Sequence, residues 1–269
     1  MDQPRYQGFD LDAETALALL DWQREMGADL PLLDTPVDRF ELPVRVAPMA
    51  PAAAAPAPAA RPDDGTADAD ARLAEAEALA AGAESLAALA EAQEGFDGIE
   101  LKRGARRFCF ADGDPRARLL ILGEAPGDEE DRQGRPFVGR AGQLLDRMFG
   151  AIGLARDAVD AERAFYVTNV LAWRPPGNRD PSPEEIALSL PFVRRHVELA
   201  APDLIVLMGN IACQAAIGQR GILRLRGGWV EAFGRPALPM THPAYLLRNP
   251  AAKRDAWADL LALQARLEG

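Results

Sequence analysis

Cysteine, histidine and long apolar runs are scarce in this chain of 269 residues. Its two cysteines are Cys109 and Cys213, and its two histidines are His196 and His242. Two thiols without a Cys-x-x-Cys pair argue against a disulfide framework or a sulfur-ligated metal site, and favour buried apolar roles for both. No apolar run is long enough to cross a bilayer, and the first residues lack the pattern of a signal peptide. We therefore expect a cytosolic protein with no membrane association.

The acidic residues are unevenly distributed along the chain, whose formal net charge is −11. Residues 1–95 contain 6 Lys and Arg against 19 Asp and Glu, whereas residues 96–269 contain 24 against 22. In the second region 22 of the 24 cations are arginine, whose planar fork suits bidentate contacts to phosphate and bases. A nearly neutral, arginine-rich region permits DNA binding but does not by itself predict it.

The composition divides the N-terminal third into three segments. Residues 1–45 form an extension with one amphipathic helix over 11–27, for which a protein partner is a minority hypothesis. Residues 46–71 are mostly Ala, Pro and small acids, which bury too little apolar surface to fold, and we predict an extended linker. Residues 72–95 are rich in Ala and Glu and predict a solvated helical lead-in.

Residues 96–269 alternate short apolar runs with helical segments, which is typical of βαβ units. The runs are 119–122, 164–171, 204–208 and a weaker one at 237–240. This pattern predicts a three-layer α/β/α domain around a mostly parallel four-stranded sheet. Because open α/β sheets bind ligands beyond the carboxyl ends of their strands, the functional residues should follow these runs.

The first such loop, residues 123–148, is rich in glycine and acids. Its glycines do not match G-x-G-x-x-G, and no Lys-Ser/Thr follows as a phosphate loop requires, so a nucleotide site is disfavoured. Asp128 to Asp131 are four consecutive acids, preceded by Glu124, and a helix is expected to begin near Gly139. Like charges packed together repel, so these acids need either partners or solvent.

The string GEAPG, followed by E-D-x-x-G-x-P-F-V-G-x-A-G-x-L-L, resembles the first motif of the uracil-DNA glycosylase superfamily, and most closely its family 4. The resemblance covers about residues 96–260. It implies that this loop, with Ala125, forms one wall of a uracil pocket. It also implies that Phe137 stacks on the base, and that Glu124 and Glu130 act on the catalytic water or the developing sugar cation.

The second loop, residues 172–186, follows the strand that ends at Asn169. An Asn amide offers one donor and one acceptor, which matches the O4 and N3–H edge of uracil. The resemblance makes Asn169 the base-reading residue and places Asn178 in the same motif. Ser182 and Glu185 have the spacing of a capping box that begins the next helix.

The third loop, THPAYLLRNP at 241–250, contains His242 and resembles the superfamily's His-Pro motif. The resemblance implies that His242 hydrogen-bonds uracil O2 as negative charge builds on the leaving base. It also implies that Leu246, Leu247 and Arg248 form a wedge that enters the duplex. Further DNA contacts are expected from two arginines of the second loop, Arg174 and Arg179. The other histidine, His196, lies in an apparent helix and is expected to have a surface or packing role.

Together these residues predict a monomeric enzyme that flips uracil out of DNA and hydrolyses its N-glycosidic bond. Because no lysine is placed to form a Schiff base, we expect a monofunctional glycosylase that leaves an abasic site. Uracil-containing DNA is the expected partner. Three alternatives stay open: action on hypoxanthine or xanthine, catalytically weak binding of uracil or abasic DNA, and nucleotide binding.

The chain departs from family 4 at the positions that resemble its iron–sulfur ligands. That family holds a [4Fe–4S] cluster on four cysteines. The aligned residues here are Phe96, Ile99, Trp173 and Ser189, and none of them can ligate iron as a thiolate. We therefore expect no metal and no cofactor, and we expect the aromatic and aliphatic residues to pack as an apolar plug.

Overall fold

The computed structural model describes residues 64–268 and the short segments Arg5–Tyr6 and Phe9–Asp10, with side chains from residue 68 onward. The two segments are strands β1 and β2 of an antiparallel pair. The chain divides into two units, Met1–Ala60 and Arg61–Gly269. The predicted helix over 11–27, nearly all of the extension 1–45 and most of the linker 46–71 lie outside the described residues.

A six-stranded sheet forms the centre of the second unit, in the order β3-β5-β4-β6-β8-β7. Its strands are β3 (Ala111–Gly113), β4 (Leu119–Gly123), β5 (Phe165–Asn169), β6 (Leu204–Met208), β7 (Val230–Ala232) and β8 (Arg235–Met240). The four central strands are parallel, whereas β3 and β7 pair antiparallel at the edges. The four predicted apolar runs are these central strands, and the edge strands are additions that the sequence analysis did not predict.

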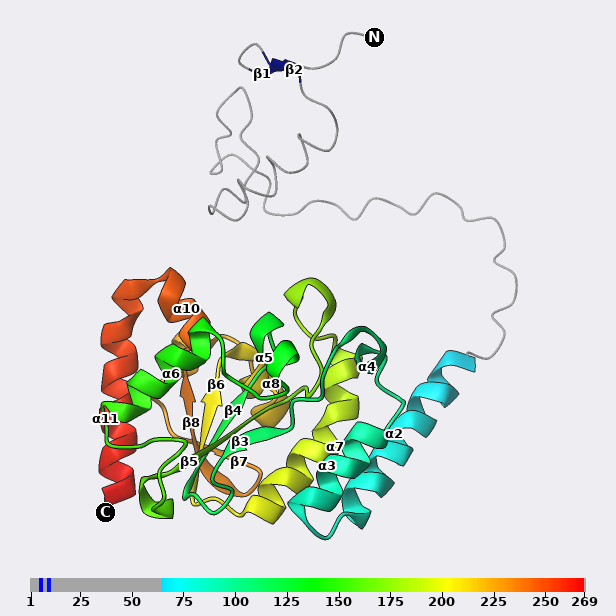
Figure 1. The fold of residues 1–269 in the computed structure, drawn as a ribbon, viewed down its shortest axis with the longest axis horizontal. Coiled ribbons are helices and arrows are strands. Elements are labelled where there is room, and N and C mark those ends of the chain that lie inside the picture. Colours follow the sequence, from blue (N-terminus) through cyan, green and yellow to red (C-terminus); the bar gives the residue numbers. More distant parts are fainter. Residues whose placement is uncertain (1–4, 7–8, 11–63, 269) are drawn as a thin grey trace, which may run out of the picture. The chain divides into compact units, whose positions relative to one another are not determined.

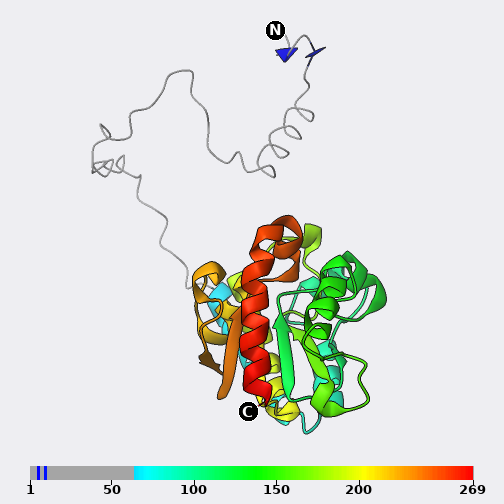
Figure 2. The ribbon, with the colours of Figure 1, turned by 90° about the vertical axis from the view of Figure 1, so that its left-hand side faces the viewer.

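Helices cover both faces of the sheet, which gives the predicted three layers (Figures 1 and 2). They are α2 (Asp64–Gly82), α3 (Leu86–Gly95), α4 (Leu101–Gly104), α5 (Asp128–Gln133), α6 (Arg140–Gly150), α7 (Pro183–Ala200), α8 (Asn210–Ile217), α9 (Ile222–Leu225), α10 (Pro243–Arg248) and α11 (Lys253–Glu268). None of these helices, in the part of the chain that the structure describes, is long and apolar enough to cross a membrane.

Alternate residues of each central strand supply two separate apolar cores. Leu120 and Leu122 of β4 pack with the helices α2, α3, α7 and α8, whereas Leu119 and Ile121 pack with α6, α10 and α11. Because successive side chains of a strand point to opposite faces, a strand buried on both sides must be apolar throughout. All five residues of β4, β5 and β6 are buried accordingly.

The lead-in at 72–95 is helical, as predicted, but the prediction that it is solvated is wrong, because its helices pack against the domain. Ala76, Ala80 and Leu89 are almost fully buried in the core beneath α7. Small alanine side chains allow close helix approach, so an alanine-rich helix can be buried without a strong apolar pattern in its sequence. The segment also forms two helices rather than one, and α2 begins at Asp64, inside the segment predicted as linker.

Candidate active site

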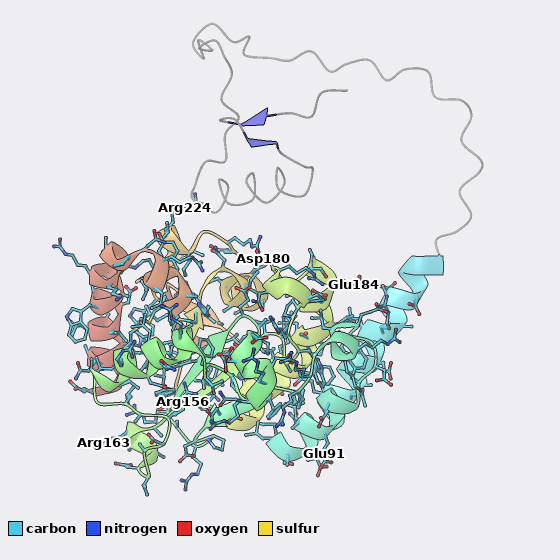
Figure 3. All side chains as sticks on the ribbon, turned by 45° about the horizontal axis from the view of Figure 1, so that its top comes forward. Glu91, Arg156, Arg163, Asp180, Glu184 and Arg224 are labelled. Atoms are coloured by element: carbon cyan, nitrogen blue, oxygen red, sulfur yellow. The ribbon has the colours of Figure 1, made fainter. Side chains whose placement is uncertain are left out.

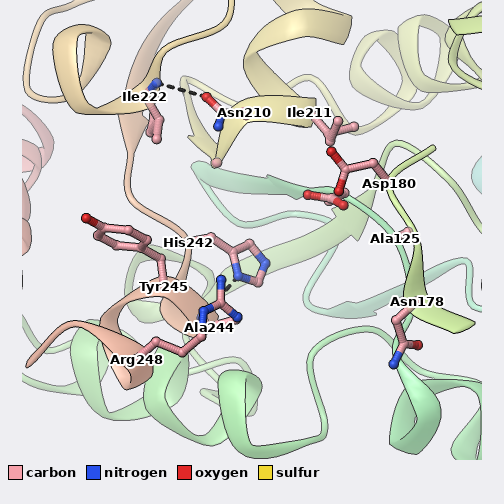
Figure 4. A pocket seen from close by; sticks show the side chains of 12 residues that line it. Ala125, Asn178, Asp180, Asn210, Ile211, Ile222, His242, Ala244, Tyr245 and Arg248 are labelled. Carbon is pink, nitrogen blue, oxygen red and sulfur yellow. Dashed lines mark hydrogen bonds between the residues drawn. The ribbon is translucent and has the colours of Figure 1, made fainter. Parts of the chain in front are cut away.

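A cavity of about 390 Å³ opens at the carboxyl ends of the parallel strands, where the sheet topology predicted the site (Figure 4). Four loops contribute to it, one after each central strand. Its lining residues are Glu124, Ala125, Asn178, Asp180, Gly209, Asn210, Ile211, Ile222, His242, Ala244, Tyr245 and Arg248. Ala125, Asn178, Arg248 and two of the predicted catalytic residues, Glu124 and His242, are therefore brought together.

Phe137 and Asn169 both lie against Gly123, the last residue of β4. A Cβ atom on Gly123 would lie 2.3 Å from Asn169 Oδ1 and 2.4 Å from the Phe137 ring, so a larger residue at this position would clash with both. The Phe137 ring in turn lies 5.5 Å from the His242 ring, centroid to centroid. Asn169 is 5% exposed, and its amide oxygen has no hydrogen-bond partner among the described residues. An unpartnered buried acceptor is costly unless a ligand pairs with it.

The backbone of Phe137 is held in a strained conformation. Its φ of 54° lies in the left-handed region, which bulky residues rarely adopt. Arg156 donates to the carbonyl oxygens of Pro136 at 3.2 Å and Phe137 at 2.9 Å, and its charge is balanced by Asp112 at 2.9 Å. The carbonyl of Phe137 also lies so close to Gly142 that a Cβ there would be 1.8 Å from its oxygen. These contacts fix where the aromatic ring points.

His242 is the N-cap of α10 and has one ring nitrogen occupied. Its Nδ1 accepts a hydrogen bond from the backbone N–H of Ala244 at 3.1 Å. Burial, with a smaller contribution from the positive charge of Arg248, lowers the pKa of His242 to about 4. The imidazole is therefore neutral at pH 7, and because Nδ1 is the acceptor, the proton must be on Nε2. His242 thus offers a neutral N–H donor.

Glu124 directly follows β4 and lines the cavity with a second carboxylate, Asp180. Burial and the negative charge of Asp180 raise the pKa of Glu124 to about 7, and Arg220 opposes the shift. Arg220 also pairs with Asp180 at 3.4 Å. A carboxylate that titrates near neutrality inside a cavity has the pKa expected of a general base.

Glu130, the other predicted catalytic carboxylate, accepts hydrogen bonds from the backbone and is absent from the cavity lining. Its two oxygens accept from the N–H groups of Gly127 at 3.1 Å, Val138 at 3.0 Å and Gly139 at 2.9 Å. These bonds tie the start of α5 to the start of α6, on either side of Phe137. The geometry therefore does not support direct action of Glu130 on water, and gives it a structural role in the loop.

The neighbouring acids also have partners, which explains how four consecutive acids are tolerated. They form the first turn of α5, where carboxylates stabilise the positive end of the helix dipole. Asp131 is buried and accepts from the backbone of Arg106 at 2.7 Å and Arg107 at 3.3 Å. Asp128 pairs with Arg174 at 2.7 Å.

The second loop is organised by its own arginines. Arg174 donates to Asn178 Oδ1 at 2.8 Å, and Arg179 pairs with both oxygens of Glu185, at 2.9 Å and 2.6 Å. Glu185 also accepts from the Ser182 backbone at 2.7 Å, while Ser182 Oγ accepts from Glu185, so the predicted capping box is confirmed. The two arginines predicted to contact DNA therefore already bind side chains of this loop and α5.

Entry of Leu246 into the duplex stays a prediction, which the burial of this side chain does not support. Leu246 is 1% exposed and belongs to the core beneath α10, because position 246 lies on the inner face of that short helix. Leu247 is half-buried, Arg248 is exposed, and Tyr245 lies on the cavity rim. Of these residues, Tyr245, Leu247 and Arg248 are thus at least partly accessible at the cavity mouth.

Two residues of the cavity lining were not predicted from the sequence. These residues are Asp180 and Tyr245. The position of Asp180 in the predicted second loop was the available signal, because every loop after a parallel strand reaches this end of the domain.

The remaining histidine, His196, is a residue of α7 and has the packing role, one of the two roles expected for it. It hydrogen-bonds Tyr166 at 3.0 Å, and burial lowers its pKa to about 3.

The positions aligned with the cluster ligands do not fit an iron–sulfur cluster. Phe96, Ile99 and Trp173 are buried in one apolar core, where Phe96 packs on Phe192 at 5.6 Å and Trp173 on Phe108 at 5.1 Å between ring centroids. Ser189 is fully buried, and within the described part of the chain its hydroxyl has no partner. Both cysteines are buried, as predicted. Among the described residues no group of three His, Cys, Asp or Glu side chains is arranged to hold a metal.

Comparison with known proteins agrees with the site's geometry. The family model of the uracil DNA glycosylase superfamily matches residues 110–261. The type-4 uracil-DNA glycosylase of Thermotoga maritima is 40% identical over 141 residues, covering 51% of this chain and 70% of that protein. The corresponding enzyme of Archaeoglobus fulgidus is 38% identical over 156 residues, covering 55% and 75%. A type-5 uracil-DNA glycosylase of Pyrobaculum aerophilum is 31% identical over 130 residues, covering 45% and 54%. This chain belongs to the uracil DNA glycosylase superfamily.

Proposed function

We propose that this protein removes uracil from DNA by hydrolysing the bond between the base and its deoxyribose. The observation that carries the proposal is the group formed by Asn169, Phe137 and His242. An orphaned buried amide oxygen, an aromatic face and a neutral N–H donor meet beside one cavity. These are the groups that bind a flat base carrying one N–H and two carbonyls.

Uracil must leave the base stack to reach this cavity, because its N-glycosidic bond is inaccessible inside a duplex. In the proposed complex, Phe137 stacks on the flipped base, and Asn169 Oδ1 accepts from uracil N3–H while its amide nitrogen donates to O4. Cytosine presents an acceptor at N3 and a donor at position 4, so the same amide orientation would oppose it. The strain at Phe137 is consistent with a ring held in place before the base arrives.

His242 stabilises the leaving base in the proposed mechanism. Breaking the bond leaves negative charge on uracil that is absent in the substrate, and the Nε2–H of His242 donates to O2 as that charge grows. A donor placed in advance, in a site that excludes water, lowers the barrier more than one that must reorient. Because the neutral imidazole already carries a proton on Nε2, it can donate at pH 7 without being converted to imidazolium.

Glu124 acts on the other product of bond cleavage, an oxocarbenium-like sugar. Its ionised carboxylate stabilises the cation, orients water toward C1′ and accepts the proton that the water loses. Burial, with a further contribution from the negative charge of Asp180, raises the pKa of this carboxyl and therefore sets the pH at which it becomes ionised. Glu130 is a positioning residue in this account, since its bonds to Val138 and Gly139 hold the backbone beside Phe137.

The enzyme is monofunctional in this proposal, because the cavity lining contains no lysine that could form a Schiff base with the sugar. Leu247 takes the wedge role instead of Leu246, and Tyr245 lies beside the entry path. The predicted monomeric state and cytosolic location stay predictions.

We further propose that the protein works without an iron–sulfur cluster. The apolar packing of Phe96 and Trp173 supports this, because it occupies positions that the family's resemblance gives to thiolate ligands. Iron analysis of protein purified without oxygen tests the proposal. We expect less than about 0.1 iron per chain, since none of the four residues can bind iron as a thiolate. Four irons per chain would overturn it.

The activity is tested with labelled oligonucleotides that carry one uracil, one hypoxanthine or one xanthine, followed by alkaline cleavage at abasic sites. We expect cleavage at uracil by the wild type and a loss of about a hundredfold or more in Asn169→Ala. Asn210→Ala is a matched control, because Asn210 also lines the cavity but its oxygen already accepts from the backbone of Gly221 and Ile222. Preferential cleavage at hypoxanthine would move the proposal to another deaminated base, and tight binding of uracil DNA without cleavage would indicate a binding protein.

A further inference from the structure

Arg248 occupies a position that a simple DNA-backbone contact does not require. It is the last residue of α10, and it lines the cavity together with His242. Figure 4 shows its guanidinium directed back over the helix toward the His242 ring, rather than away from the cavity. No salt bridge of Arg248 is found among the described residues.

The electrostatic effect of Arg248 reaches the group that would contact the leaving base. Its positive charge is one of the two causes of the low pKa of His242, after burial. A cation that can repel a proton from His242 can attract an anion placed at the same point, because both effects come from the same local potential. A uracil anion held by His242 would be in that position.

We propose that Arg248 is a catalytic residue that stabilises the negative charge on the departing uracil from the wall of the cavity. This inference rests on the proposed function. The bond between uracil N1 and C1′ breaks with its electron pair going to the base, and water adds to C1′ and loses its proton to Glu124. Arg248 stays protonated throughout and transfers nothing, so its contribution is purely electrostatic and grows as the bond breaks.

The test exploits the basicity of the leaving group. Single-turnover cleavage is measured with saturating enzyme on oligonucleotides that carry either uracil or 5-fluorouracil, for the wild type, Arg248→Gln and Arg248→Lys. Fluorine withdraws electrons, so 5-fluorouracil leaves as a weaker base and needs less stabilisation. We expect Arg248→Gln to lose about ten- to a hundredfold with uracil but clearly less with 5-fluorouracil. Arg248→Lys should recover part of the loss, because it retains the positive charge.

Arg224→Gln provides a matched control, since Arg224 is an exposed arginine at the same end of the domain, outside the cavity lining (Figure 3). It should change cleavage of both substrates by the same factor. Equal losses for both substrates in Arg248→Gln would overturn the inference and identify Arg248 as a backbone contact. If the wild type cleaves neither substrate, the proposed function itself fails, and this inference fails with it.

A measurement without substrate gives an independent readout. The pKa of His242 is followed by NMR in wild type and Arg248→Gln, with the signal of His196 as an internal control. We expect the pKa of His242 to rise in the variant while that of His196 stays unchanged, since removal of a nearby cation favours the imidazolium. An unchanged His242 would show that the charge of Arg248 does not act at this point and would overturn the inference.

Discussion

The cavity region and the aromatic cluster around Phe96 and Trp173 differ in how completely their side chains are paired. Around the cavity, Asn169 has an unpartnered oxygen, Phe137 is held at positive φ, and Glu124 lies beside a second acid. Around Phe96 and Trp173, by contrast, aromatic and aliphatic side chains fill one core against α7. The cavity region thus contains groups that a ligand can satisfy, whereas the side chains of the aromatic cluster already pack against one another. Substitutions in the first region should change activity more than stability, and those in the second the reverse.

The largest predicted effect is on stability, from Phe96→Ala. Phe96 is 2% exposed and packs on Phe192, so its truncation leaves a cavity that the neighbours cannot fill. We expect a loss of about 3–5 kcal/mol in the free energy of unfolding, measured by urea denaturation. Leu261→Ala is the control, because Leu261 is 44% exposed and should change stability little. A loss below about 1 kcal/mol would contradict the claim that packing of Phe96 in the core stabilises the fold.

The two carboxylates of the first loop should separate activity from stability. Glu130→Ala removes three backbone hydrogen bonds to a charged acceptor, so we expect a loss of roughly 2–3 kcal/mol in unfolding free energy together with reduced cleavage. Glu124→Gln should instead reduce the single-turnover rate while leaving the melting temperature close to that of the wild type. If the Glu124 variant is destabilised and the Glu130 variant is not, the roles proposed for the two residues are reversed.

The buried histidine of α7 should make stability depend on pH. Burial lowers the folded-state pKa of His196 to about 3, whereas an unfolded histidine titrates near 6.5. The unfolded chain therefore binds a proton that the folded chain excludes, so stability is lost as pH falls from about 6.5 toward 3. At pH 5.5 this proton uptake lowers the free energy of unfolding by about 1 kcal/mol. Urea denaturation of His196→Phe across pH 4–8 should show a shallower dependence than the wild type, and an identical slope would contradict this account.

The smallest predicted effect concerns the pH dependence of cleavage. Because Glu124 acts when ionised and its pKa is about 7, activity should rise as pH increases through 7. Asp180→Asn should move this rise to lower pH, and Arg220→Gln should move it to higher pH. The shift is expected to be a few tenths of a unit, because Asp180 is 76% exposed and solvent screens its charge. Both shifts should shrink in 1 M salt, and movement of both variants in one direction would contradict the electrostatic cause.

Local patterns in the sequence predicted the parts of the structure that local chemistry determines. Continuous apolar runs identified the four parallel strands, and Ser182 with Glu185 identified the start of α7. The edge strands were missed because each has three residues, too few for a periodic signal. The burial of Leu246 and the packing of α2 were also missed. Both depend on which face of a helix meets the rest of the domain, and single-sequence periodicity is weakest in short or alanine-rich helices.

The resemblance to a family named residues from loops that the structure brings to one cavity, but it assigned roles without contacts. Glu130 is the clearest case, since its position in the motif suggests chemistry while its three backbone bonds give it a structural role. Asp180 shows the converse, because a residue outside the quoted motifs shares the cavity with Glu124.

The central claim is that the cavity at the carboxyl ends of the strands, with His242 as its donor, performs uracil release. The most direct measurement is the single-turnover rate of uracil release at 25 °C by wild type and His242→Ala, with the melting temperature of each determined in the same buffer. The account predicts uracil release by the wild type and a loss of about a hundred- to a thousandfold in the variant, with little change in melting temperature. Equal rates for the two proteins, or no uracil release by a folded wild type, would contradict it.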